Sequence, residues 1–178
     1  MIIILAGLPG SGKSTLAHEL AKRIEATVLD KDGIRAALFA PADIEYSTSQ
    51  DDFVVGIMMQ VAGYVVHRGK SRPIILDGRP FSRRYQLEQI IRFAEQIEEP
   101  WCILECVCSD ETARLRLEQS ANQQAHPAMN RDFNLYLRLK QQFEEITVSK
   151  TVIDTDQPLE LCIEKSMSAL QSASLRRS

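Results

Sequence analysis

Short apolar runs alternate along the chain with longer segments in which apolar residues recur every three or four positions. The first pattern is typical of buried strands, and the second is typical of helices that pack one face on a core. The apolar runs predict strands at residues 2–6, 27–29, 73–77, 101–108 and 151–154. The spaced segments predict helices at residues 13–25, 32–39, 50–68, 83–97, 110–119, 131–146 and 159–173. This alternation indicates βαβ units and therefore an α/β fold with a parallel sheet.

The length and composition suit one folded unit. The 178 residues are 44% hydrophobic, which is enough for one substantial core, so we predict a single domain over residues 1–178. No apolar run reaches the roughly 18 to 20 residues of a membrane span. The apolar start at residues 2–6 lacks a basic leader and runs into a glycine-rich loop, unlike a signal peptide. We therefore expect a cytoplasmic protein with no membrane partner.

Charge and cysteine content narrow the partners further. The net charge is −3, so no overall positive field attracts polyanions, and nucleic acid is disfavoured as a partner. The chain has four cysteines but no C-x-x-C pair, and three of the four lie in the apolar run at residues 101–108. Buried, reduced thiols explain this pattern better than a zinc site or disulfides do.

The strongest motif follows the first predicted strand. Residues 7–15 read Gly-Leu-Pro-Gly-Ser-Gly-Lys-Ser-Thr and fit the P-loop pattern G-x-x-x-x-G-K-S/T between a strand and a helix. The backbone N–H groups of such a loop and the helix N-terminus together bind phosphate. The predicted nucleotide contacts are Gly10, Ser11, Gly12, Lys13, Ser14 and Thr15. A glycine-rich turn without nucleotide is disfavoured because every position of the motif fits.

Two of these P-loop residues have specific predicted roles. Lys13 is expected to face solvent and to bridge the β- and γ-phosphates of ATP, which makes it catalytic as well as cofactor-binding. The Ser14 hydroxyl is expected to bind Mg²⁺.

A second candidate group follows the second predicted strand, where Asp30 and Asp32 precede Arg35. Phosphoryl transfer needs a carboxylate to receive the proton of the acceptor hydroxyl and cations to hold the moving phosphoryl group. Asp32 and Arg35 have suitable types and spacing for these roles. The alternative is that Asp30 or Asp32 caps the following helix, because aspartate is a favoured N-cap. One residue could do both.

The third predicted strand ends at Asp77, in the position of a Walker-B acid, so Asp77 is expected to hold Mg²⁺ or to orient Ser14. Arginines at 79, 83 and 84 follow closely and could reach phosphates. For Arg83 and Arg84, a solvated first turn of helix explains the sequence equally well.

Two polar, irregular segments are candidates for the substrate side, since loops at the carboxyl ends of parallel strands bind ligands. We predict that residues 40–52 form an acceptor-side loop and that residues 119–131 form a lid. The first segment carries four acidic residues, Asp43, Glu45, Asp51 and Asp52. That rim suits a sugar-like or cationic acceptor better than a polyanion. Arg114 and Arg116 precede the lid and point different ways on a helix, so at most one of them faces the nucleotide.

Residues 7–15, the Asp32-x-x-Arg35 pair and residues 152–159 resemble the small P-loop kinases, in particular the zeta-toxin-like, chloramphenicol-phosphotransferase-like and polynucleotide-kinase-like group. The resemblance implies a P-loop NTPase fold: a three-layer αβα sandwich with a five-stranded parallel sheet of order 2-3-1-4-5 and a helical lid. It implies that Asp32 is the general base and that Arg35 contacts the acceptor or the scissile phosphate.

The same resemblance implies that Thr155 and Pro158 border the adenine base and that Arg116 lies by the nucleotide. These kinases commonly carry an arginine four residues after the one matching Arg116, and this position is Ser120 here. The lid arginine must then come from elsewhere, and Arg131 is the first choice.

The sequence therefore predicts a kinase that uses ATP and Mg²⁺ and phosphorylates a small molecule with a hydroxyl group. Two other readings stay open. A polynucleotide 5′-hydroxyl kinase would share the catalytic residues but should have a basic channel with aromatic side chains. A non-catalytic ATP-binding regulatory module would bind ATP without any acceptor that raises turnover.

Overall fold

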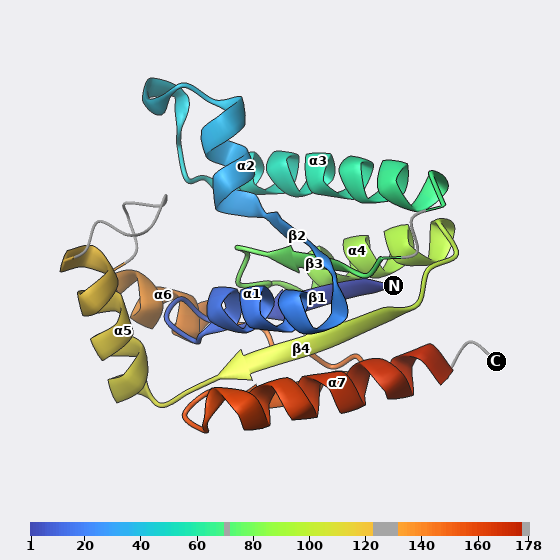
Figure 1. Ribbon diagram of the computed structural model, residues 1–178. Coiled ribbons are helices and arrows are strands. Elements are labelled where there is room, and N and C mark those ends of the chain that lie inside the picture. The colour runs from blue at the N-terminus through green and yellow to red at the C-terminus, as the bar shows by residue number, and fades with distance from the viewer. Residues whose placement is uncertain (70–71, 123–131, 176–178) are drawn as a thin grey trace.

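A parallel β-sheet forms the centre of the protein. The computed structural model describes residues 1–69, 72–122 and 132–175 (Figure 1). The strands of the sheet are β1 (Ile2–Ala6), β2 (Thr27–Asp30), β3 (Ile74–Asp77), β4 (Trp101–Val107) and β5 (Thr151–Asp154). Their order is β2-β3-β1-β4-β5, and every pairing is parallel. The predicted α/β fold and the strand order implied by the resemblance are both confirmed.

Helices connect successive strands and cover the sheet. They are α1 (Lys13–Ile24), α2 (Lys31–Leu38), the short 3₁₀ helix η1 (Pro41–Asp43), α3 (Thr48–His67), α4 (Arg84–Gln96), α5 (Asp110–Asn122), α6 (Phe133–Gln142) and α7 (Leu159–Leu175). Each confirms a helix predicted from the apolar spacing, apart from η1, which lies in a segment expected to be irregular.

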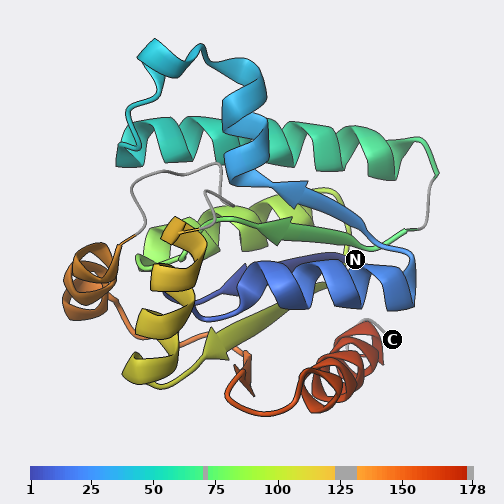
Figure 2. The same ribbon diagram turned by 60° about the vertical axis from the view of Figure 1, so that its left-hand side comes forward.

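The two faces of the sheet have separate apolar cores. Ile3 and Leu5 of β1 belong to the core beneath α1 and α7, whereas Ile2 and Ile4 belong to the core beneath α3 and α4 (Figure 2). Because β1 is central and covered on both faces, all of its residues are buried. This explains why its sequence is a continuous apolar run rather than an alternating one.

The carboxyl ends of the strands lie at one edge of the sheet, next to α5 and α6 (Figure 1). These two helices pack together through Tyr136 of α6, whose hydroxyl donates to the carboxylate of Asp110 at 2.6 Å. Lys140 also donates to that carboxylate, at 2.5 Å. Both bonds lower the pKa of Asp110, and the lysine bond has the larger effect. The edge where ligands bind in α/β folds is thus flanked by a helical unit.

Several predicted boundaries differ from the structure by a few residues, and two of these differences bear on the site. The helix expected over residues 131–146 ends at Gln142, because the following segment is held against the β3–α4 connection instead. There the backbone N–H of Glu144 donates to the carbonyl of Ser82 at 2.9 Å, and Ile146 enters the core beneath α3 and α4. In the predicted acceptor-side loop, residues 48–52 already form the first turn of α3, where the Ser47 hydroxyl caps the helix.

Within the described ranges of the chain, none of the helices has both the length and the apolar character needed to cross a bilayer.

Candidate active site

The phosphate-binding loop connects β1 to α1 at the carboxyl edge of the sheet, as the motif predicts. Gly12 is the N-cap residue of α1 and has a left-handed conformation with φ of 78°. It contributes no side chain, so no side-chain hydrogen bond satisfies the first N–H groups of the helix at this cap. Free N–H groups at a helix N-terminus, together with the helix dipole, form an anion site.

Lys13 is turned back onto the phosphate-binding loop. Its ammonium group donates to the carbonyl oxygens of Gly7 at 2.7 Å and Leu8 at 2.8 Å. The expectation that Lys13 faces solvent is wrong: the residue is buried. A buried ammonium needs acceptors, and the loop carbonyls supply them. Phosphate oxygens would be stronger partners than these carbonyls, because they carry charge.

The start of α2 separates the two aspartates that the sequence left ambiguous. The side chain of Asp30 accepts from the N–H groups of Asp32 at 3.1 Å and Gly33 at 3.0 Å, so Asp30 is the N-cap. Asp32 itself does not cap the helix and is buried. Its carboxylate is therefore available for other contacts.

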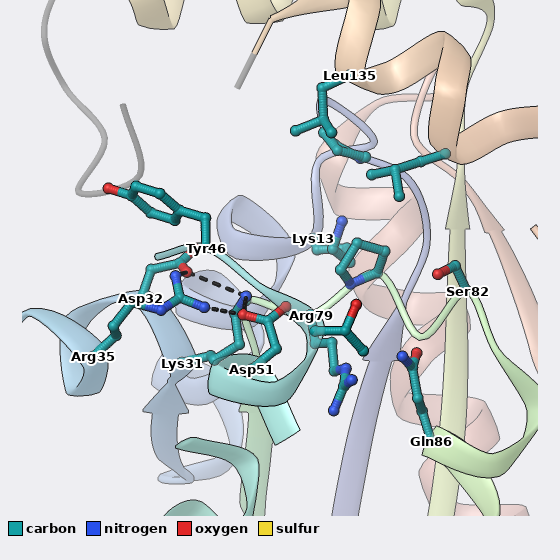
Figure 3. Close-up of a pocket in the computed structure, with 15 residues that line it drawn as sticks. Lys13, Lys31, Asp32, Arg35, Tyr46, Asp51, Arg79, Ser82, Gln86 and Leu135 are labelled. Carbon is teal, nitrogen blue, oxygen red and sulfur yellow. Dashed lines mark hydrogen bonds and ion pairs between the residues drawn. The ribbon is translucent and has the colours of Figure 1, made fainter. Parts of the chain in front are cut away.

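A buried charge cluster surrounds Asp32, and we define it as Lys31, Asp32, Arg35 and Asp51. Arg35 donates to Asp32 at 2.7 Å, and Lys31 lies 3.3 Å from the same carboxylate. The carboxylate of Asp51, on α3, bonds to Lys31 at 2.8 Å and also to Arg35 (Figure 3). Each acid thus contacts both cations, which is the arrangement that buried charges require. The cluster fixes α2 against the start of α3.

Tyr46 covers one side of this cluster. The Arg35 guanidinium lies 5.1 Å from the centre of its ring, a cation–π contact. Tyr46 also has a positive φ of 51°, which is strained for a residue with an aromatic side chain. The segment between η1 and α3 is therefore held over α2.

Asp77 ends β3 beside Asp30, its register partner on β2. It is 1% exposed, and neither of its carboxylate oxygens has a hydrogen-bond partner within the described part of the chain. A buried, unpartnered carboxylate is costly and calls for a cation. Mg²⁺, which binds through few protein oxygens and several waters, suits a buried carboxylate of this kind.

Gly78 allows β3 to turn beside the β2–α2 junction. Its φ is +92°, and a Cβ at this position would lie 2.9 Å from the Oδ1 of Asp30 and 2.9 Å from the Cβ of Lys31. Any larger residue would push Lys31 away from the charge cluster. The glycine therefore keeps Asp77 and the charge cluster close together.

The three arginines after β3 have different positions. Arg79 is buried and donates to the carboxylate of Asp52 at 2.5 Å. Arg83 is half-exposed and pairs with Glu144 at 3.3 Å, while the backbone N–H of Arg84 donates to the same glutamate. These contacts lower the pKa of Glu144, with the bond from Arg84 as the main cause. Arg83 and Arg84 thus anchor the segment after α6, and only Arg79 reaches the site.

On the other side of the phosphate-binding loop, Arg116 joins the loop to the segment after β5. It donates to the carbonyl of Gly10 at 3.3 Å and to the hydroxyl and carbonyl of Thr155 at 2.9 and 2.8 Å. The Thr155 hydroxyl also donates to the carbonyl of Ser11 at 3.1 Å. Pro158 is exposed at the start of the following helix turn, where its carbonyl accepts from Cys162. Arg116, Thr155 and the loop therefore form one connected group, with Pro158 at its outer edge.

One cavity of about 160 Å³ lies between the phosphate-binding loop, α2, α3, the β3–α4 connection and Leu135 and Leu139 of α6 (Figure 3). We call it the charged cavity. Its charged lining residues are Lys13, Lys31, Asp32, Arg35, Asp51 and Arg79. The structure thus places Lys13 beside the predicted pair of Asp32 and Arg35.

Of the four acids expected to rim the acceptor site over residues 40–52, Asp51 lines the charged cavity. Asp51 and Asp52 are held by buried cations, as described above, and Asp43 and Glu45 are exposed and do not line the charged cavity. The sequence shows four acids but not their partners, which come from other elements. Because Asp51 and Asp52 are paired with cations, they do not form a free acidic rim, and the preference for a sugar-like or cationic acceptor stays a prediction.

Arg131 and most of the predicted lid lie outside the described residues. Cys102, Cys106, Cys108 and Cys162 are free thiols, as expected. Burial raises the pKa of Cys106 to about 12; Lys13 opposes this shift and Asp77 adds to it. Cys106 therefore stays a neutral thiol near the site.

Sequence reasoning missed Lys31 as a site residue. Lys31 lies between Asp30 and Asp32 in the sequence, and either aspartate could have been taken as its ion-pair partner at the surface. The available signal was the lack of any apolar residue at positions 30–32, where a strand meets a helix. Its long-range partner Asp51 could not be identified from that signal.

The phosphate-binding loop at the end of β1, on this sheet order, defines the P-loop NTPase fold. The chain belongs to the AAA domain family, whose model matches residues 2–146. A comparison with curated proteins gives no match.

Solved structures with the same fold include several kinases. A gluconokinase from Sinorhizobium meliloti 1021 is similar with a TM-score of 0.70 and 14% identity, over 97% of this chain and 93% of that chain. The APS kinase of Mycobacterium tuberculosis, solved with AMPPNP and APS, has a TM-score of 0.71 and 16% identity over 96% of each chain. Chaetomium thermophilum Kti12, solved with ADP-AlF3, has a TM-score of 0.66 and 18% identity, over 95% of this chain and 98% of that chain.

Proposed function

We propose that this protein is an ATP-dependent kinase that transfers the γ-phosphate of ATP to a hydroxyl group of a small molecule. The observation that carries the proposal is that Lys13 of the phosphate-binding loop and the buried carboxylate of Asp32 line the same cavity. Phosphoryl transfer needs both groups at one place, since a cation holds the moving phosphoryl group and a carboxylate receives the hydroxyl proton.

The nucleotide half of the proposed site is the loop from Gly10 to Thr15. The N–H groups of the loop and of the first turn of α1 would hold the phosphates, and Lys13 would exchange its loop carbonyls for β- and γ-phosphate oxygens. Arg116 and Thr155 would form one wall of the nucleotide site, and Pro158 would border the base. In the small P-loop kinases that this sequence resembles, the residues matching Thr155 and Pro158 lie by the adenine base.

Ser14 and Asp77 would hold Mg²⁺. A Mg²⁺ ion held there would supply positive charge to offset the negative charge that develops during transfer. The protein supplies Asp77 as a buried carboxylate whose oxygens have no partner among the described residues, so a cation here also relieves the cost of burying that charge.

Asp32 would accept the proton of the acceptor hydroxyl, and Arg35 would contact the acceptor or the transferred phosphoryl group. Lys31 and Arg35 offset the charge of Asp32 while it is buried. Because the transition state of phosphoryl transfer is loose, the base mainly orients the hydroxyl and takes its proton late. A base held by two cations is adequate for that task.

The named activities of the structural relatives agree with this class of reaction, since gluconokinase and APS kinase are both kinases. The proposed group is the zeta-toxin-like, chloramphenicol-phosphotransferase-like and polynucleotide-kinase-like set of small kinases. A polynucleotide 5′-hydroxyl kinase and a non-catalytic ATP-binding module are the competing functions, and both are outcomes of the test below.

The test is ATP consumption measured against a panel of hydroxylated metabolites, antibiotics and 5′-hydroxyl oligonucleotides. We expect at least one small molecule to raise turnover above the rate with ATP and Mg²⁺ alone. Stimulation by oligonucleotides only would favour the polynucleotide kinase. Tight ATP binding without stimulation by any panel member would favour the non-catalytic module and contradict the proposal.

A further inference from the structure

Arg79 lines the charged cavity, and one of its hydrogen-bond donors has no partner in the described part of the chain. The residue is 2% exposed and lines the cavity between Asp51 and Gln86 (Figure 3). One terminal nitrogen, Nη2, donates to Asp52 at 2.5 Å. The other, Nη1, is buried and has no hydrogen-bond partner among residues 1–69, 72–122 and 132–175. An unsatisfied donor on a buried guanidinium is costly, so its position needs an explanation.

The charge cluster next to Arg79 does not supply the missing acceptor. Lys31 and Arg35 are matched there by Asp32 and Asp51, which contact these two cations. The cluster is therefore balanced within itself. Arg79 belongs to a separate pair, with Asp52.

The partner of Arg79 only partly offsets its charge. The side chain of Asp52 is 35% exposed, so solvent screens it, and its carboxylate also accepts from the hydroxyl of Tyr85 at 3.1 Å. Only one edge of the guanidinium fork is used. The remaining edge suits an oxygen of a carboxylate, phosphate or sulfate, because these groups match the planar fork of arginine.

We infer that the molecule bound in the charged cavity carries a negatively charged oxygen group, which Arg79 binds. This inference rests on the proposed function for the cavity's role as the acceptor site, and it names the class of acceptor as an anionic hydroxylated small molecule. A sugar acid meets this description, whereas a cationic acceptor does not. Arg79 is a specificity-determining residue in this account.

The first test measures anion binding directly. The protein is saturated with Mg²⁺ and a non-hydrolysable ATP analogue, so that the phosphate-binding loop is filled, and is then titrated calorimetrically with sulfate or with acetate. Sulfate resembles a phosphate group and acetate carries a carboxylate, so the two ions distinguish the two kinds of recognition. Both are small, so neither needs a cavity of a particular shape. We expect saturable binding of at least one of them, weakened about tenfold to a hundredfold by Arg79→Gln.

Three variants make the result specific. Arg79→Lys keeps the charge but loses the fork, so its affinity should fall between those of the wild type and Arg79→Gln. Asp52→Asn removes the internal competitor and should strengthen anion binding, an effect that damage to the fold would not produce. Arg92→Gln makes the same change at an exposed arginine of α4 and should leave affinity unchanged.

The second test uses acceptors in pairs that differ only in the charged group, such as D-gluconate with D-glucitol and APS with adenosine. We expect the anionic member of a pair to be phosphorylated faster, with the preference lost in Arg79→Gln. Equal anion affinity in the wild type and Arg79→Gln, or no saturable anion binding, would overturn the inference. Anion binding that depends on Arg79 without phosphorylation of any acceptor would leave the inference standing and contradict the proposed kinase activity.

Discussion

The phosphate-binding loop and the charged cavity lie side by side but are built in different ways. The loop consists of consecutive residues, and two of the partners of Lys13 are backbone carbonyls only 6 and 5 positions away. The charged cavity consists of side chains from several elements. Lys31 and Asp51 are 20 positions apart, and Arg79 and Asp52 are 27 positions apart.

This difference suggests a division of roles, in which the loop is the part that the fold keeps constant and the cavity is the part that selects the substrate. A loop made of backbone N–H groups depends on glycines and on the strand–helix connection, so a short motif specifies it. A cavity made of side chains can change its partners while the sheet and helices stay the same. We therefore expect the nucleotide half of the proposed site to be shared by a wide class of proteins, and the charged cavity to select the acceptor.

The largest effect should come from Asp32→Asn, which removes the proposed base from the charged cavity. We expect phosphoryl transfer to fall by about 10²- to 10⁴-fold while the affinity for Mg-ATP stays nearly unchanged. The measurements are turnover with an acceptor found in the panel and nucleotide affinity by calorimetry.

Asp51→Asn is the matched control, since Asp51 contacts the same two cations. Both variants break a buried ion pair, so both should lower stability, by up to about 3–5 kcal/mol. Transfer should fall less than about tenfold in Asp51→Asn once the folded fraction is taken into account. Equal losses of transfer in the two variants would show that Asp32 acts only through the charge cluster.

The next effect tests the phosphate-binding loop. Lys13→Ala should lower turnover by about 10²- to 10³-fold, the usual effect of losing one charge-stabilising donor, and should weaken ATP binding. Lys22→Ala, at an exposed lysine of the same helix, should leave both unchanged. Unchanged ATP affinity together with unchanged turnover in Lys13→Ala would contradict the P-loop assignment.

A smaller effect is expected at Asp77, where one substitution should raise stability and lower nucleotide affinity. Asp77→Asn removes a buried charge whose oxygens have no partner among the described residues, so the nucleotide-free protein should gain about 1 kcal/mol or more in its free energy of unfolding. Nucleotide affinity in the presence of Mg²⁺ should fall by about tenfold, with weaker Mg²⁺ dependence.

Denaturant unfolding and calorimetry measure the two effects at Asp77. Asp43→Asn, at an exposed acid, is the control and should change neither. A loss of stability in nucleotide-free Asp77→Asn would mean that the carboxylate already has a stabilising role there.

The smallest effect should come from the cap of α2. Asp30→Ala removes the acceptor for the N–H groups of Asp32 and Gly33, which should cost about 0.5 to 2 kcal/mol of stability. Transfer should fall only as far as folding does. Asp30→Asn keeps a capping oxygen and should retain most of that stability. A large loss of transfer in a fully folded Asp30→Asn protein would give Asp30 a direct role in the site.

Most of the fold could be predicted from the sequence. The continuous apolar run of β1 and the spaced apolar residues of α1 are local signals, and each predicted strand and helix is present. The end of α6 could not be predicted, because Glu144 and Ile146 leave the helical path to contact Ser82 and the core beneath α3 and α4. Such contacts are decided by the packing of distant segments.

For the candidate site, the sequence by itself determined the residues whose positions are fixed by the strand or helix that they end or begin. The phosphate-binding loop, the acid at the end of β3 and the aspartates at the start of α2 can all be read in this way, because strand ends and helix starts fix where their side chains lie. Only the tertiary structure decided which acids and cations pair. It showed that Asp30 caps α2, that Asp51 and Asp52 are held by buried cations, and that one donor of Arg79 has no partner among the described residues. Ion pairs between separate elements depend on distances and burial that come into being only when those elements pack together.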